Sequence, residues 1–425
     1  MNLSRRATLL GLATVATLGR TRLALAAAPT DSRFVVVLLR GALDGMEAVI
    51  PHGDPDLARL RPGLVPQAAS WHDLGGFYAL HPALARFHTL YAAGELLAVH
   101  AIAGPYRTRS HFEAQDLLQT GVEQIGMNSG WLNRLIAELP ADGDPGGIGL
   151  AAGIGTPLIL RGAAPVGAYA PVGFAQPDQG LYAAIGRLNA GDPVFGPAIA
   201  RGLGSRRFDQ ATFTAGAAPA MEDEHMMNPA GPAHPVGHPA GHPVGRPADR
   251  LAGHPADRYG FPELAARVGT LLAAAQGPRI AAFQLEGWDT HVNQMQLLPG
   301  PLGGLDRGVA ALKAALGPAW AKTAVLVITE FGRTARVNGT RGTDHGTATV
   351  AFLAGGAVLG GRVKATWPGL KDRQLFQNRD LAPTADLRAL AKGVLAAQFG
   401  LGPAALGRIF PESAAIAPMG GLLRA

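Results

Sequence analysis

The stretch Phe34–Leu39 reads FVVVLL and runs directly into Arg40-Gly41-Ala42-Leu43-Asp44-Gly45. An unbroken apolar run rich in β-branched valine predicts a strand that is buried on both faces, as in a parallel sheet. In open α/β sheets, ligands bind outside the carboxyl ends of the strands. The polar residues that follow this run are therefore candidates for a functional site.

The same pattern recurs along the chain. Further short apolar runs predict strands at Leu96–Ile102, Pro157–Leu160, Ile280–Leu285, Ala324–Ile328 and Thr349–Leu353. Apolar residues at helical spacing lie between them, around Leu84–Tyr91, after Pro262 and over Leu305–Leu316. Strands that alternate with helices predict an α/β fold: a doubly wound, mainly parallel sheet with helices on both faces.

Composition limits the class of protein. The chain has 425 residues, of which 48% are hydrophobic and 16% charged, so a wholly disordered chain is excluded. The absence of cysteine excludes disulfides, thiolate zinc sites, iron–sulfur clusters and a cysteine nucleophile. The net charge is +6, yet aromatic residues make up only 6% and no compact basic helix carries them. We therefore expect no nucleic-acid partner.

The N-terminus predicts export. Residues 1–28 contain four arginines and no acidic residue, and Ser4-Arg5-Arg6-Ala7-Thr8-Leu9-Leu10 resembles a twin-arginine (Tat) motif. A short apolar stretch follows, and Ala26-Ala27-Ala28 offers a small-residue cleavage site. The alternative is an ordinary amphipathic helix. We expect a Tat signal peptide over 1–28, the Tat machinery as a partner, and a periplasmic or secreted protein without a stable membrane span.

One segment breaks the α/β pattern. Between Pro229 and Pro255 there are seven prolines and four histidines in a loose His-Pro-(Ala/Val)-Gly repeat. Repeated proline is incompatible with helix and strand, so we expect a flexible insertion at about 204–257 within a single α/β domain over 29–425. Metal capture is one interpretation of its histidines, and low-complexity drift in a surface loop is the simpler one; they are His234, His238, His242 and His254.

Acidic residues and histidines follow or precede several of the predicted strands. Asp289 and His291 come after Ile280–Leu285, and Asp344 and His345 come before Thr349–Leu353. Residues two apart on an extended segment project the same way, so Asp289 and His291 could share one ion. An isolated Asp-x-His pair is also common as a turn cap. Because several acidic residues and histidines lie at successive strand ends, we expect a divalent metal: zinc first, with manganese, magnesium or calcium as alternatives.

Candidate catalytic residues lie near Ser110. The segment Ser110-His111-Phe112-Glu113 has the pattern of a capping box that opens a helix running to Thr120, with Gly121 ending it. A hydroxyl at a helix start could also act as a nucleophile toward an anion, with His111 beside it. Arg109 and Arg333 could neutralise a substrate oxyanion, although solvated arginines are the simpler interpretation.

With these motifs, the chain resembles a Tat-exported bacterial family catalogued as domain of unknown function 1501. The resemblance spans nearly all of the expected mature chain except the His-Pro insertion, and it rests on motifs that occur in the same order: 39–45, 106–116, 287–291, 329–333, 342–346 and 383–401. That family is in turn similar to the alkaline phosphatase and sulfatase superfamily, whose core carries two metals at strand ends. The resemblance therefore implies an alkaline phosphatase-like core.

The superfamily resemblance also implies roles for particular residues. Asp44 corresponds to a ligand of the second metal, Asp289 and His291 to ligands of the first, and His345 to the late histidine ligand. Glu330 stands in the place of an Asp-His pair, with Phe331 replacing the histidine. Ser110 resembles the nucleophile by location.

Two functions follow as expectations. The first is an exported metal-dependent hydrolase of phosphate, sulfate or related esters, acting on a small anionic ester. The alternative is an exported binding or assembly protein that keeps the fold without catalysis, with a structural metal or none.

Overall fold

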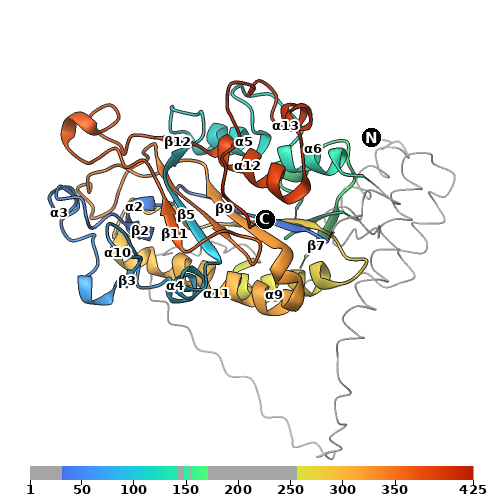
Figure 1. Cartoon of the computed structure of the whole chain (residues 1–425). Coiled ribbons are helices and arrows are strands. Elements are labelled where there is room, and N and C mark those ends of the chain that lie inside the picture. The colour runs from blue at the N-terminus through green and yellow to red at the C-terminus, as the bar shows by residue number, and fades with distance from the viewer. Residues whose placement is uncertain (1–30, 141–147, 154, 171–255, 425) are drawn as a thin grey trace, which may run out of the picture.

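The computed structural model describes residues 31–140, 148–153, 155–170 and 256–424 (Figure 1). The expected signal peptide and nearly all of the expected His-Pro insertion lie outside these residues. The fold is α/β with a nine-stranded, mainly parallel sheet. The strand order is β11-β5-β10-β9-β1-β8-β6-β7, with β12 paired to β5.

Most predicted strands are confirmed. The observed strands of the main sheet are β1 (Arg33–Leu39), β5 (Leu96–Ala103), β6 (Gly149–Ala152), β7 (Gly167–Tyr169), β8 (Ile280–Leu285), β9 (Thr323–Thr329), β10 (Thr349–Ala354), β11 (Arg362–Lys364) and β12 (Ala385–Asp386). A small second sheet contains β2 (Val49–Ile50), β3 (His72–Asp73) and β4 (Ala79–Leu80).

The strand predicted at Pro157–Leu160 is wrong. Leu158–Leu160 forms the 3-10 helix η3. Side chains rather than a neighbouring strand satisfy its backbone: Gln119 accepts from the Ile159 amide at 3.1 Å, and Asn133 donates to the Leu160 carbonyl at 2.9 Å. Short apolar runs do not distinguish a strand from a buried turn.

Strand β1 lies inside the sheet and explains its two-sided core. It pairs in parallel with β8 on one side and β9 on the other. Val35, Val37 and Leu39 belong to one buried cluster, whereas Phe34, Val36 and Leu38 alternate into the other. Full burial of each such large side chain stabilises the fold by roughly 1.5–3 kcal/mol.

Helices cover both faces, as expected (Figure 1). One face carries α4 (Ala85–Ala92), α9 (Ala256–Ala273) and α11 (Pro299–Leu316). The other carries α5 (His111–Thr120), α6 (Trp131–Glu138), α12 (Leu387–Phe399) and α13 (Pro403–Ile409). Short helices α2 (Gly45–Ala48), α3 (Leu57–Leu60) and α10 (Gln294–Leu297) lie in the connections. None of the helices in the described residues is long and apolar enough for a membrane crossing.

The direction of β10 departs from the expected parallel arrangement. Strand β10 is antiparallel to both β9 and β5. Its amino end therefore lies at the edge where β1, β5, β8 and β9 have their carboxyl ends. The loop that precedes β10 is thereby brought to the same edge as the loops that follow the other strands.

A buried polar network fixes the chain after β1. Asp44 caps α2 through the amides of Met46 and Glu47, and its other oxygen accepts from Arg61 at 2.7 Å and Gln294 at 2.7 Å. Gln294 also donates to Glu47, whose side chain is buried. Burial raises the pKa of Glu47 to about 8, and the charge of Asp44 adds to the rise, against the opposing effects of Gln294 and Arg61.

This raised pKa predicts a pH-dependent stability. The pKa of Glu47 in the folded protein lies above its ordinary value of 4.5, so the folded state holds a proton that the unfolded state releases. The free energy of unfolding should fall as pH rises from 4.5 to 8, by about 1.4 kcal/mol per pH unit from this group. Glu47→Gln removes the effect. Urea unfolding at pH 5.5, 6.5 and 7.5 measures it, with the exposed Glu263→Gln as control; parallel curves for wild type and Glu47→Gln would contradict it.

Candidate functional site

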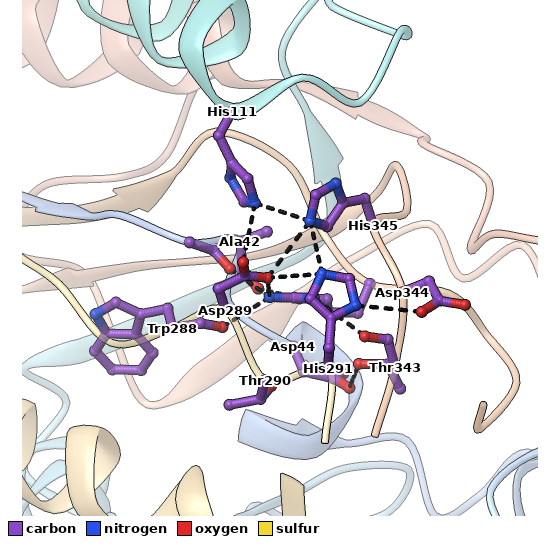
Figure 2. Close-up of polar contacts among 12 residues, drawn as sticks. Ala42, Asp44, His111, Trp288, Asp289, Thr290, His291, Thr343, Asp344 and His345 are labelled. Carbon is purple, nitrogen blue, oxygen red and sulfur yellow. Dashed lines mark hydrogen bonds and ion pairs between the residues drawn. The ribbon is translucent and has the colours of Figure 1, made fainter. Parts of the chain in front are cut away.

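Three histidines and one carboxylate meet at this edge of the sheet (Figure 2). His111 is the first residue of α5, Asp289 and His291 lie in the loop after β8, and His345 lies in the loop before β10. The Nε2 atom of His345 is 2.9 Å from Nε2 of His111 and 2.9 Å from Nε2 of His291. Asp289 Oδ1 lies 3.0 Å from Nε2 of His291 and 3.4 Å from Nε2 of His345.

The opposite ring nitrogens of these histidines face acceptors. His111 Nδ1 lies 2.7 Å from Glu330 Oε1, and His345 Nδ1 lies 3.0 Å from the carbonyl oxygen of Arg109. A carbonyl or an ionised carboxylate can only accept, so each Nδ1 is assigned as the donor. In the neutral rings the Nε2 lone pairs then point at each other, and a proton or a cation is needed between them.

The Nδ1 atom of His291 also faces an acceptor, on the more exposed side of the site. Its Nδ1 lies 3.2 Å from Asp344 Oδ1, and its side chain is 39% exposed. Asp344 thus lies behind His291, away from the Nε2 atoms. We call His111, Asp289, His291 and His345 the histidine cluster.

The donor set fits a divalent metal ion. One ligand atom each from His111, Asp289 and His345 lies within 4.8 Å of the others. Metal-bound histidines commonly donate their second ring nitrogen to a carboxylate or carbonyl, which fixes the tautomer and the ring. Imidazole and carboxylate ligands together suit zinc and manganese, whereas calcium and magnesium prefer oxygen.

At the histidine cluster, neighbouring charges and burial shift the pKa values of Asp289 and His111 in opposite directions. Burial raises the pKa of the Asp289 carboxyl, but hydrogen bonds from His111, His345 and Arg333 outweigh it and hold that pKa well below its ordinary range. Burial disfavours the charged form of His111, yet the carboxylates of Asp289 and Glu330 prevail and raise its pKa to about 9. At neutral pH a proton therefore occupies His111, and a bound cation must displace it.

Arg333 holds Asp289 in place. Its buried guanidinium donates to Asp289 Oδ1 at 2.5 Å and to four backbone carbonyls, those of Gly41, Ala42, Trp288 and Thr343. Gly41 also allows the loop after β1 to lie close to the backbone of Asp289, because a Cβ there would lie 2.5 Å from the Asp289 amide nitrogen. From the sequence we expected Arg333 to neutralise a substrate oxyanion. In the structure its guanidinium donates to five acceptors within the protein.

Arg109 is likewise engaged by the protein. Its Nε and Nη2 atoms donate to Asp380 Oδ2 at 3.0 and 2.8 Å, and Nη2 also donates to Gln377. Asp380 is fully buried. Arg109 adopts a left-handed backbone with φ of 64°, which is costly for a residue with a side chain. The ion pair with Asp380 holds this conformation, in which the Arg109 carbonyl accepts from His345.

Glu330 lies behind His111. Its Oε1 accepts from His111, from the Gly41 amide at 2.9 Å and from Gln115 at 3.1 Å, and its Oε2 accepts from Thr329. Phe331, the next residue, packs against the rings of His111 and His345. The structure thus brings Glu330 to the site as a hydrogen-bond partner of a histidine.

Asp44 is not brought to the histidine cluster. Its two oxygens are engaged by the α2 amides, Arg61 and Gln294, so a guanidinium neutralises the carboxylate that the resemblance assigned to a second metal. This arrangement supports one metal position among the described residues.

The helix after Ser110 is confirmed, but its capping box is wrong. Helix α5 begins at His111 and ends with Gly121 in the left-handed conformation, and the Ser110 side chain makes no capping hydrogen bond. The Glu113 carboxylate instead accepts from Tyr106 at 2.5 Å. From the sequence we predicted His111 as a catalytic residue and not as a metal-ligand candidate. It shares a helix face with Gln115, which also contacts Glu330.

Comparison with known proteins gives one match. The model of a family described as "Protein of unknown function (DUF1501)" matches residues 210–410. This range includes Asp289, His291, Glu330 and His345 but not His111, and it supports the resemblance to that family. No curated protein and no solved structure matches the chain.

The contact between Asp380 and Arg109 predicts a variant that weakens metal binding from a distance. Asp380→Asn should release the Arg109 guanidinium, free its backbone and misalign His345. If the histidine cluster holds zinc, as proposed below, the zinc affinity should fall about 10- to 100-fold. Chelator competition measures the zinc Kd, and circular dichroism checks the fold. Asp372→Asn, which removes an exposed carboxylate paired with Arg59 and Arg336, is the control. Equal zinc affinity for wild type and folded Asp380→Asn would refute this role.

Proposed function

We propose that the protein is an exported metal-dependent hydrolase of phosphate, sulfate or related esters. The observation that carries the proposal is the convergence of three imidazole Nε2 atoms on Asp289, each with its Nδ1 directed at an acceptor. His111, Asp289 and His345 would hold the ion, with zinc as the first choice. A bound divalent cation supplies Lewis acidity toward the anionic ester.

His291 is suited to move a proton. Asp344 accepts from its Nδ1 and fixes the tautomer, so the lone pair of Nε2 faces the cluster. This pairing of a carboxylate with an imidazole is the arrangement used by general bases. We assign His291 Nε2 as the acceptor of the proton from an attacking water. Ser110 is a weaker candidate for the nucleophile. Its backbone amide donates to the Tyr106 hydroxyl, and its side chain makes no capping hydrogen bond, so no base is seen to activate its hydroxyl among the described residues.

The superfamily resemblance supports the choice of reaction. The order of motifs, with Asp289 and His291 after one strand and His345 before a later one, resembles the order expected from that superfamily. The pairing of Asp44 with Arg61 departs from a two-metal arrangement. The proposal is therefore restricted to chemistry at one ion.

A second candidate is a non-catalytic binding or assembly protein with a structural metal. Arg109 and Arg333 are both tied to internal acceptors, and Phe331 packs against two of the histidines. These contacts favour a site that holds a metal without providing a free cationic side chain for a substrate anion.

Export is proposed on the motif Ser4–Leu10. Replacing Arg5 and Arg6 by lysine should abolish delivery to the periplasm, because the Tat motif is read through its arginine pair. Fractionation of a Tat-competent bacterial host measures it. Lysine at Arg20 and Arg22, which conserves charge equally, is the control, and undiminished export of the Arg5/Arg6 variant would exclude the Tat route.

Two variants separate the roles of ligand and base. Asp289→Ala should lose both zinc and hydrolysis of p-nitrophenyl phosphate or p-nitrophenyl sulfate. His291→Ala should keep zinc and lose about 10²- to 10⁴-fold in turnover. Elemental analysis and steady-state rates measure the two effects, with His88→Ala on α4 as control.

The outcomes distinguish the two functions. Zinc retained by wild type with no turnover of either ester would leave the binding protein as the function. A folded protein that takes up no divalent metal would refute the metal centre itself.

A further inference from the structure

A groove opens beside the histidine cluster, outside the carboxyl ends of β6 and β8. It has a volume of about 880 Å³ and is bounded by α5, α9, α11, Gly153 and residues 155–158. This is within the range of sites that enclose small molecules. We call it the lateral groove.

The lateral groove and the histidine cluster share a wall. Gln115 lines the groove and donates to Glu330 Oε1, the oxygen that His111 Nδ1 contacts. Trp288 also lines the groove and directly precedes Asp289. A ligand in the groove would therefore lie next to the proposed reaction centre.

The groove offers charged and amide groups. Arg161 and Arg307 are exposed on its walls, and Arg307 makes no hydrogen bond or ion pair with the described residues. Arg40 and Glu286 largely offset each other, at 3.2 Å, which leaves Asp116 as the remaining carboxylate. The balance is cationic. An acyl chain does not suit such walls, because it would leave these groups desolvated and unpaired.

The exposed aromatic residue limits the class of ligand further. Phe112 is 84% exposed at the rim, Phe261 is partly buried, and Trp288 is buried in the wall. Single-stranded nucleic acids need successive exposed stacking rings, and of the three aromatic residues that line the groove only Phe112 is largely exposed. One aromatic face beside amides and guanidiniums suits a pyranose ring, whose C–H face packs on the aromatic while its hydroxyls hydrogen-bond.

Helix α11 leaves space on the groove side. A Cβ built at Gly300 or Gly304 would meet nothing within 4 Å, and both residues line the groove. Glycine inside a helix costs about 1 kcal/mol relative to alanine. Glycine at these positions keeps the wall open at the expense of helix stability.

We infer that the lateral groove binds an acidic oligosaccharide. Arg161 and Arg307 would hold its carboxylate or sulfate groups, and Phe112 would pack on a sugar ring. The inference rests on the proposed function in one respect: it places the ester-bearing end of the oligosaccharide at the histidine cluster. Binding itself does not depend on catalysis.

Calorimetry with the full mature chain tests the inference, with tetragalacturonate, a chondroitin sulfate tetrasaccharide, neutral cellotetraose and tetraglutamate as the probes. Tetragalacturonate should bind, and cellotetraose should bind about tenfold more weakly or not at all, because charge-assisted hydrogen bonds are lost. Gly304→Trp should abolish binding by filling the groove. Gly407→Trp is the matched control, since Gly407 also lies within a helix, α13, with nothing within 4 Å of its added Cβ. Arg307→Ala should weaken binding about tenfold.

Several results would overturn the inference. These are no binding of either tetragalacturonate or a chondroitin sulfate tetrasaccharide, binding unchanged in folded Gly304→Trp, or tighter binding of tetraglutamate than of tetragalacturonate. Asp289→Ala should still bind the oligosaccharide. Oligosaccharide binding without any ester turnover would refute the proposed hydrolase alone, and turnover of p-nitrophenyl esters without oligosaccharide binding would refute the groove alone.

Discussion

The buried guanidinium of Arg333 is the contact on which the site depends. It joins the loop after β1, the loop after β8 and the loop before β10 through four carbonyls, and it pairs with Asp289. A charge buried this deeply is stable only when its donors are satisfied. The five acceptors therefore fix the loops relative to one another, and with them the carboxylate at the centre of the histidine cluster.

The direction of one strand brings the last histidine to that centre. In an all-parallel sheet the loop before β10 would lie at the far edge, away from Asp289. Because β10 is antiparallel to β9 and β5, its amino end reaches the edge where those strands finish. His345 then meets His111 and His291, which come from segments far from it in the chain.

Residues behind the three histidines hold their rings in place. Each Nδ1 donates a hydrogen bond to a different acceptor: Glu330, the Arg109 carbonyl or Asp344. Asp380 holds Arg109 in its left-handed conformation. These contacts fix ring orientation before any ion or ligand binds. The lateral groove meets the same framework at Gln115, so recognition and chemistry would share one rigid wall.

The sequence predicted the α/β class, five of the main strands and the rim on which the polar residues gather, because apolar runs and helical spacing report burial directly. It missed β6, whose residues Gly149–Ala152 are glycine, leucine and alanine with little strand preference, and it misread Leu158–Leu160. Which polar residues meet depends on the tertiary structure. Asp44 pairs with Arg61, while His111 joins the histidine cluster, because the partners of a side chain depend on strand direction and loop packing that local sequence does not encode.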